Sequence, residues 1–472
     1  MQSTNTDLAL CTANELTALF SSHKASPVEA LQAVEKRIDL LNPKLNAFCF
    51  RASESALEQA KLSEQRWLKG VALSDLDGIP VSIKDLILTE GMPTLRGSFT
   101  VDATQPWDVD APITARLKEA GAVLLGKTAT PEFGCKAETN SPLTGITCNP
   151  WNLTKTPGGS SGGASAAVSA NLGPIGIGTD GAGSIRIPAA FCGNFGFKPS
   201  FGRVPAYPLS PFGTVAHLGP LTMSVEDAAT TMNVIKKPDA RDWTSLPYDD
   251  KNYLETLKKG VNGLKIAFSP TLGYVKNVDP EVALKVAEAA KIFESLGAHI
   301  ELVDPGFEDP IEISTGLWFL GSFSVWSGLT KDQQSKCDQD FVAQAELGRN
   351  LSALDIQKIN LRRGVLGSHM RQFMCRYDLL LTPAVSIPAF DALPAGHRKM
   401  DASTMLGWTP FSYPFNLTQQ PACSMPCGVT SSGLPVAFQL VGPMFADDLV
   451  LQASYAFEEA MPILRPPKDF AS

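Results

Sequence analysis

Four short apolar runs, almost free of charge, constrain the fold of this chain more than any other feature. Runs of this kind are typical of strands that are buried on both faces. They are Gly78–Lys84, Ala122–Leu125, Asp378–Thr382 and Pro435–Val441. Between residues 264 and 303 the pattern alternates, because strand-like Leu264–Ser269 and His299–Val303 flank an amphipathic helix over Pro280–Leu296. The sequence therefore predicts an α/β sandwich with a substantially parallel sheet.

The first 70 residues are expected to be helical. Thr12–Glu15 and Ser26–Glu29 both match the capping box that begins a helix. We expect the second helix to stop at Asn42-Pro43, because proline removes a backbone donor. A charged stretch, Ser53–Lys69, predicts a third, solvent-facing helix.

Composition narrows the class of protein. The chain has 472 residues, 44% of them hydrophobic, and a formal charge of −8, which gives no reason to expect nucleic acid or an anionic membrane as a partner. The N-terminus lacks the pattern of a secretory signal, and no run reaches the ~20 apolar residues needed to cross a bilayer. The nearest run, Gly316–Trp326, predicts buried core or a pocket wall. Nine cysteines without paired spacing favour reduced thiols and no zinc site, so we expect a cytoplasmic enzyme.

One motif is misleading. Gly121–Thr128 matches the P-loop pattern of nucleotide-binding proteins letter for letter. However, a predicted helix rather than a strand precedes Gly121, and the residues that should form a loop are the apolar Ala122–Leu125. We therefore predict a strand and no nucleotide site here.

The stretch from Pro157 to Gly202 is dense in glycine, serine and alanine and carries the candidate chemistry. Pro157–Gly163 contains Ser160, and Ser184 follows three small residues at a predicted strand-to-helix turn. Amides exposed beside a serine hydroxyl can hold an oxyanion. None of the five histidines lies in these motifs, so a serine–lysine arrangement is the alternative to a histidine base.

Together these motifs resemble the amidase signature family. The resemblance spans nearly the whole chain, in the family's order, and highly specific motifs carry it. The matching stretches are Gly78–Asp85, Gly126–Thr128, Asn149–Trp151, Gly158–Gly163, Gly178–Ala189, Gly193–Arg203, Pro414–Leu417, Pro426–Gly428 and Leu434–Pro443.

The resemblance implies roles for individual residues. Ser184 is the implied nucleophile, Ser160 the proton relay on a cis peptide bond, and Lys84 the general base. The implied oxyanion hole comprises the amides of Gly181, Ala182, Gly183 and Ser184. Many family members have glycine where this chain has Ala182, which keeps its N–H and is expected to narrow the pocket slightly. Phe133, Gly134 and Cys135 should border that pocket.

The resemblance also implies the architecture: one domain over residues 1–472, built on a large twisted mixed β-sheet covered by helices on both faces. We divide it into a helical segment (1–70), a catalytic core (71–225), a variable substrate-side region (226–400) and a C-terminal part of the core (401–472). No cofactor and no metal is implied. The expected partner is a small-molecule amide, ester or carbamate. Whether the chain forms a homodimer is left open.

The lysine chemistry can also be argued from the residues. A lysine base must be neutral, yet its reference pKa is about 10.4, so burial behind Ile79–Ile83 is needed to lower it. The Asp85 side chain should point to the opposite face of the strand, so its carboxylate should not approach the Lys84 amine and favour its protonated state. Asp180 and Arg186 are expected to pair and brace the turn of Ser184.

Three questions stay open at this level. Leu317, Trp318, Phe319 and Trp326 either line an apolar acyl or aryl site or are simply core. The chain is either a stand-alone amidase or the glutamine-hydrolysing subunit of a tRNA-dependent amidotransferase, and Tyr413–Leu417 favours the former. An inactive scaffold conflicts with the intact Lys84, Ser160 and Ser184.

Overall fold

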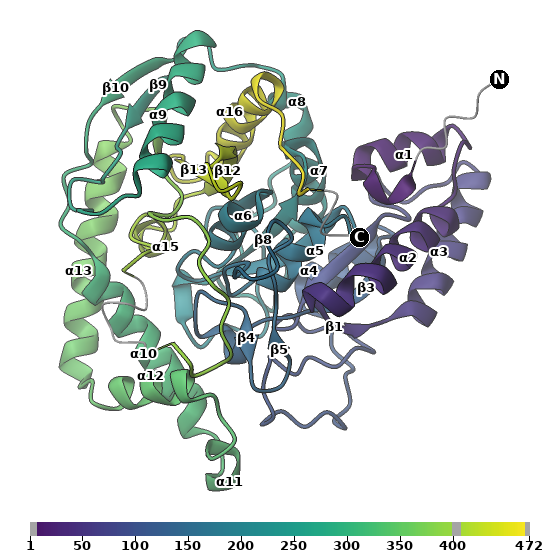
Figure 1. Cartoon of the computed structure of the whole chain (residues 1–472), viewed down its shortest axis with the longest axis horizontal. Helices are drawn as coiled ribbons and strands as arrows, with labels where there is room; N and C mark the ends of the chain where they lie inside the picture. The colour runs from purple at the N-terminus through teal and green to yellow at the C-terminus, as the bar shows by residue number, and fades with distance from the viewer. Residues whose placement is uncertain (1–6, 399–406, 468–472) are drawn as a thin grey trace.

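The computed structural model describes residues 7–398 and 407–467, and its centre is a large mixed β-sheet (Figure 1). Within the described residues the sheet has eleven strands in the order β1-β3-β2-β6-β8-β7-β12-β13-β11-β9-β10. Their bounds are β1 (Phe48–Arg51), β2 (Pro80–Lys84), β3 (Val123–Thr128), β6 (Ile175–Asp180), β7 (Phe195–Lys198), β8 (His217–Thr222), β9 (Lys265–Phe268), β10 (His299–Leu302), β11 (Leu379–Pro383), β12 (Ala422–Val429) and β13 (Pro435–Val441). A separate hairpin pairs β4 (Asn140–Ser141) with β5 (Gly145–Ile146).

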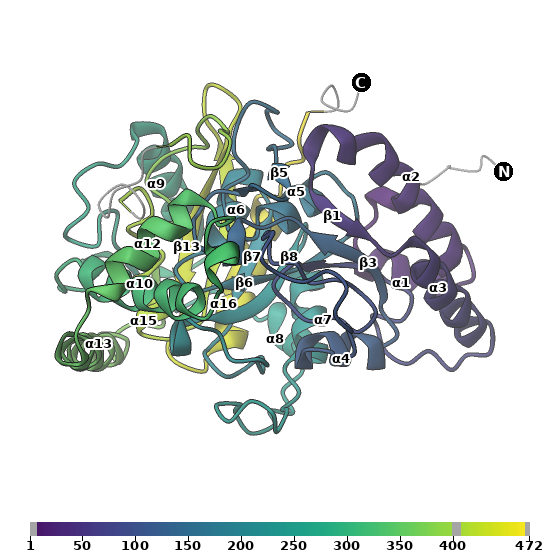
Figure 2. The ribbon, with the colours of Figure 1, turned by 90° about the horizontal axis from the view of Figure 1, so that it is seen from below.

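The helices surround this sheet, with α1–α3 at one end of the molecule and α10–α13 at the other (Figures 1 and 2). Their bounds are α1 (Ala13–Ser21), α2 (Pro27–Leu45), α3 (Ser53–Leu68), α4 (Pro112–Glu119), α5 (Gly162–Ser169), α6 (Arg186–Cys192), α7 (Val225–Ile235), α8 (Tyr253–Leu257), α9 (Pro280–Ser295), α10 (Ile311–Ser327), α11 (Lys331–Gln334), α12 (Gln339–Arg349), α13 (Ala353–Phe373), α15 (Pro414–Leu417) and α16 (Asp447–Ala460). No helix among the described residues is both long and apolar enough to span a bilayer.

The sheet is mixed rather than substantially parallel. Strand β2 pairs in parallel with β3 and β6, and β9 pairs in parallel with β10 and β11. In the centre of the sheet every pair of neighbouring strands is antiparallel, and the strands lie there in the order β6, β8, β7, β12, β13 and β11. The prediction from apolar runs was wrong on this point, because a run without charge reports burial on both faces and not strand direction.

Helices cover both faces of the sheet, as the resemblance implied. The reason is visible at β6, whose successive side chains point to opposite faces. Ile175 and Ile177 belong to the core cluster that includes α7. Gly176 faces the other way, where an added Cβ would lie 3.1 Å from Val168 and 3.2 Å from Ala164 of α5. Glycine at this position therefore lets α5 pack directly on the strand.

The N-terminal capping boxes form as predicted, with Thr12 and Ser26 accepting from the amides of Glu15 and Glu29. Helix α2 does not stop at Asn42-Pro43, however, and continues to Leu45. Proline in the last turn removes one hydrogen bond, whereas Leu41 and Leu45 are both fully buried. Burial of these two leucines outweighs the missing bond.

The P-loop pattern is a strand, as predicted. Val123–Thr128 forms β3 beside β2, and the Lys127 side chain is buried. Its amine donates to the carbonyl of Ile87 and, at 2.9 Å, to the hydroxyl of Thr89. The backbone amides of this segment are thus part of the sheet and are not arranged around a phosphate.

Candidate active site

The Lys84 amine lies at the carboxyl end of β2 and is fully buried. It contacts three hydroxyl groups, those of Ser160 at 2.7 Å, Ser161 at 2.9 Å and Thr179 at 2.9 Å. Burial lowers the pKa of Lys84 well below its ordinary value, and the negative charge of Asp180 opposes this only in part. A neutral amine is the state that a general base requires.

Asp85 points away from this amine, as the alternation of a strand predicted. Its carboxylate accepts from the amides of Leu95 at 3.1 Å and Gly97 at 3.2 Å, on the side of the strand where Lys127 lies. Asp85 is not among the charges that influence Lys84. Asp85 therefore does not help to hold the Lys84 amine protonated, and Asp180 is the carboxylate whose charge acts on it.

Ser160 and Ser184 line the same cavity, which has a volume of about 160 Å³. Ser160 precedes α5, and its peptide bond with Gly159 is cis, as the resemblance implied. Ser184 follows β6 and is 6% exposed. The backbone of Ser161 donates to the Ser184 carbonyl at 3.1 Å, which ties the two serine segments together.

Gly134 packs over Ser160 and leaves no room for a side chain. Its φ is +70°, and an added Cβ would lie 2.8 Å from Leu86 and 3.3 Å from the Ser160 hydroxyl oxygen. Phe133 lines the same cavity as Gly134, whereas Cys135 lines a smaller cavity that also touches Ser184. The Phe133–Cys135 segment therefore borders the site, as the sequence predicted.

The turn that carries Ser184 is braced by a buried ion pair. Arg186 and Asp180 are both fully buried and lie 3.0 Å apart. Asp180 also accepts from the Gly183 amide at 2.7 Å, and Arg186 donates to Gln439 at 2.6 Å and to Asn416 at 2.5 Å. Burial would raise the pKa of Asp180, but the charge and hydrogen bonds of Arg186 hold it below its ordinary value. This pair acts as the brace that the sequence predicted.

Replacing Arg186 with methionine should destabilise the protein strongly, because Asp180 would be left as an uncompensated buried charge. We expect a loss of about 3–5 kcal/mol in the free energy of unfolding, measured by urea denaturation. Arg362→Met removes an exposed ion pair with Glu312 and should cost below about 1 kcal/mol. Equal losses in the two variants would contradict the brace.

The four amides named for the oxyanion hole are not equivalent. The Gly183 amide is already bonded to Asp180, whereas no described residue accepts from the amides of Gly181, Ala182 or Ser184. Gly181 and Ser184 line the main cavity, and Ala182 and Ser184 line the smaller one. Three amides of this turn are therefore without an acceptor among the described residues.

Ala182 does not line the main cavity but borders the smaller one, which Cys135 and Ser184 also line. It packs in a cluster with Trp318, Phe319 and Tyr413 and is 5% exposed. Trp318 closes the cavity above the turn, because an added Cβ on Gly181 would lie 2.7 Å from its ring. Of the four side chains on α10 that were left open between core and pocket, Trp318 alone lines the cavity of Ser184.

The sequence interpretation did not identify two contacts of the Lys84 amine, those with Ser161 and Thr179. Ser161 is adjacent to Ser160 in the glycine-rich motif, and Thr179 precedes Asp180 at the end of β6. The pairing of β2 with β6 sets Ile83 opposite Ile177, so the end of β6 lies next to Lys84, and Thr179 contacts the amine there. The register alone points to Gly178 as the residue opposite Lys84, so knowledge of the pairing would have located this end of β6 but not the Thr179 side chain. Among the described residues no group of His, Cys, Asp and Glu is arranged to hold a metal ion.

Comparison with known proteins assigns the chain to a family. The family model described as Amidase matches residues 29–451. The chain belongs to the amidase signature family. Three relatives show how far the likeness to other family members extends.

An acylamidase of Rhodococcus erythropolis is 36% identical over 97% of each chain. A subunit of the glutamyl-tRNA(Gln) amidotransferase of Alkaliphilus metalliredigens is 32% identical over 93% of this chain and 94% of that protein. The crystal structure of a bacterial aryl acylamidase superposes with a TM-score of 0.89 at 30% identity, covering 96% of each chain. The family, the fold and the hydrolysis of an amide C–N bond are therefore shared.

Proposed function

We propose that this amidase hydrolyses small-molecule carboxamides through an acyl-enzyme, with Ser184 as nucleophile, Ser160 as proton relay and Lys84 as base. The Ser184 oxygen attacks the carbonyl carbon, and its proton passes through the Ser160 hydroxyl to the Lys84 amine. The proton then goes to the leaving amine as the C–N bond breaks. Water then attacks the acyl-enzyme ester and gives its proton to Lys84 by the same path, and the carboxylic acid leaves as the C–O bond breaks and Ser184 regains its proton.

The single observation that carries this proposal is the shell of hydroxyls around the Lys84 amine. A hydroxyl both donates and accepts, so it can accept from an ammonium and, where its own proton is not already bonded elsewhere, donate to a neutral amine. Ser161 already donates to the Thr179 carbonyl at 3.1 Å, whereas Ser160 contacts the Lys84 amine at 2.7 Å. Ser160 is thus a hydroxyl that can pass a proton to Lys84 and take one back.

The hydroxyls of Ser160 and Ser184 line one cavity but are not hydrogen-bonded to each other. This fits an enzyme without substrate, because catalytic hydrogen bonds often shorten only when substrate binds. The negative oxygen that forms on the substrate would accept from the amides of Gly181, Ala182 and Ser184.

The cavity supports a compact apolar substrate. Its wall includes Trp318 stacked on Phe212, with ring centroids 4.0 Å apart, and a volume of about 160 Å³ suits a group the size of one aromatic ring. The acylamidase and aryl acylamidase relatives point to acyl amides and anilides. Esters and carbamates present the same carbonyl and are expected as side substrates.

The test is turnover of a panel of anilides, aliphatic carboxamides, esters and carbamates by the purified chain alone. We expect the anilides and small carboxamides to be hydrolysed, with release of the amine measured directly. Glutaminase activity that appears only with partner subunits, and no turnover of the panel, would favour the role in an amidotransferase complex instead.

Ser160→Ala should lower turnover by roughly 10²–10⁴, because the proton path from Ser184 to Lys84 is broken while the fold remains. The matched control is Ser424→Ala, which removes another buried hydroxyl, one without a hydrogen-bond partner. Steady-state kinetics on an anilide separate the two variants. A folded Ser160→Ala enzyme with full activity would rule out the relay.

A further inference from the structure

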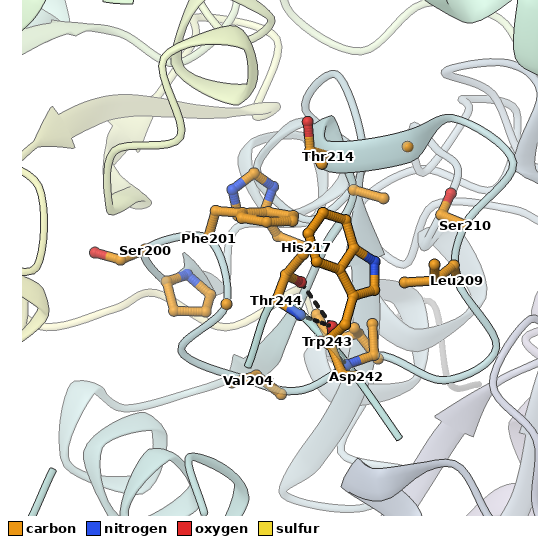
Figure 3. A pocket seen from close by; sticks show the side chains of 16 residues that line it. Ser200, Phe201, Val204, Leu209, Ser210, Thr214, His217, Asp242, Trp243 and Thr244 are labelled. Carbon is orange, nitrogen blue, oxygen red and sulfur yellow. Dashed lines mark hydrogen bonds between the residues drawn. The ribbon is translucent and has the colours of Figure 1, made fainter. Parts of the chain in front are cut away.

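A second pocket of about 150 Å³ lies beside the catalytic cavity (Figure 3). The two share six lining residues, so the segment from 206 to 218 forms a common wall between them. These residues are Ala206, Leu209, Ser210, Ala216, His217 and Leu218. The second pocket is therefore a neighbour of the substrate cavity and not a remote surface feature.

The second pocket offers a ligand no free charge. Its one carboxylate, Asp242, is 4% exposed and accepts from the amides of Ala206 and Thr244, both at 2.8 Å, and from the Thr244 hydroxyl at 2.6 Å. The His217 ring lies 2.8 Å from the Val215 carbonyl through Nδ1, so this nitrogen carries the proton of a neutral ring. Burial lowers the pKa of His217 well below its ordinary value, which keeps the ring neutral.

The remaining lining is mostly apolar, with the hydroxyls of Ser200, Ser210 and Thr214 among it, and it is partly open to solvent. Figure 3 shows the Trp243 indole with Phe201 and His217 on one side and Leu209 on the other. Trp243 is 77% exposed and Leu209 53%, and Tyr207 of the neighbouring cavity is 39% exposed. Single exposed apolar side chains are common on proteins, but a group of them around the mouths of two pockets marks a binding surface.

The backbone that carries the exposed indole is held in place. Asp242, the residue before Trp243, accepts from the amide of Ala206 in the shared wall and from the amide of Thr244, the residue after Trp243. This anchoring fixes the loop at the pocket, where the flat face of the Trp243 indole can pack on a ligand.

Size, charge and position together indicate the ligand. A cavity of about 150 Å³ with a mostly apolar lining accommodates a ring the size of benzene. We propose that the second pocket binds an uncharged aromatic ring of the substrate, carried at a distance from the amide that reacts at Ser184. This inference rests on the proposed amidase function, and it defines the substrate class as amides with an aromatic group at a remote end.

Two series of substrates test it. One carries the ring on the amine side, as N-(ω-phenylalkyl)acetamides, and the other on the acyl side, as N-methylamides of ω-phenylalkanoic acids. Each compound is compared with the alkyl amide of the same chain length. The ratio of kcat/KM for the phenyl compound to kcat/KM for the alkyl compound then gives the contribution of the ring alone. We expect this ratio to rise in one series once the chain is long enough to cross the shared wall.

Trp243→Ala should lower the raised ratio about ten-fold, and Trp243→Phe, which keeps an aromatic face, should retain most of it. The control is Tyr248→Ala, which removes another exposed aromatic side chain (61%) that lines neither pocket, and its ratio should match that of the parent enzyme.

A ratio that never rises, or that rises equally in Trp243→Ala, would overturn the inference while hydrolysis of the alkyl amides upholds the amidase function. Activation of the short alkyl amides by added 2-phenylethanol, without dependence on chain length, would mark an effector site and also overturn it. Absence of turnover for every amide would refute the proposed function itself.

Discussion

Ser184→Ala is expected to lower turnover by roughly 10⁴–10⁶, the largest loss of any single substitution in this protein. Its oxygen forms the bond to the acyl group, and no other residue of the turn from Gly181 to Ile185 carries a hydroxyl. A fluorophosphonate probe should also phosphonylate the Ser184 oxygen with loss of fluoride. Peptide mass spectrometry would locate the adduct on the segment after β6.

The variant also supplies its own control, because Ala182 and the Asp180–Arg186 pair hold the turn independently of the Ser184 hydroxyl. Its melting temperature should therefore stay close to that of the parent enzyme. Labelling that persists in Ser184→Ala would show that another residue is the nucleophile.

Lys84 has the second largest expected effect. Lys84→Ala removes the base and should cost roughly 10²–10⁴ in turnover. Lys84→Arg should fail almost as badly, because a guanidinium stays protonated at any workable pH and cannot accept the proton. Lys336→Arg, at an exposed lysine paired with Asp332, serves as the control and should be fully active.

The pH dependence follows from the lowered pKa of Lys84. At low pH the amine is protonated and cannot act as a base, so turnover should rise with pH as Lys84 loses its proton and then hold into mildly alkaline solution. Lys84→Ala should lack this rise. If a folded Lys84→Arg enzyme kept substantial activity and turnover of the parent enzyme did not rise with pH, Lys84 would be only a structural cation.

The strands and the positions of the candidate site residues could be predicted from the sequence, because both depend on local patterns. Apolar runs such as Gly78–Lys84 and Pro435–Val441 became β2 and β13, and the capping boxes at Thr12 and Ser26 began α1 and α2. The glycine-rich motifs located Ser160 and Ser184, since few backbones other than tight turns require so many small residues. Those motifs also revealed the family, and with it the mixed sheet covered on both faces.

The partners of these residues were decided only by the tertiary structure. Arg186 reaches Asn416 and Gln439, and Trp318 covers Gly181, across more than a hundred residues of chain. Such contacts depend on which strands pair and in which direction, and an apolar run is equally well buried in several pairings. The same holds for Thr179 beside Lys84 and for the pocket between Phe201 and Trp243. The sequence thus determined which groups are candidates for the chemistry, and the packing of distant segments decided which of them meet.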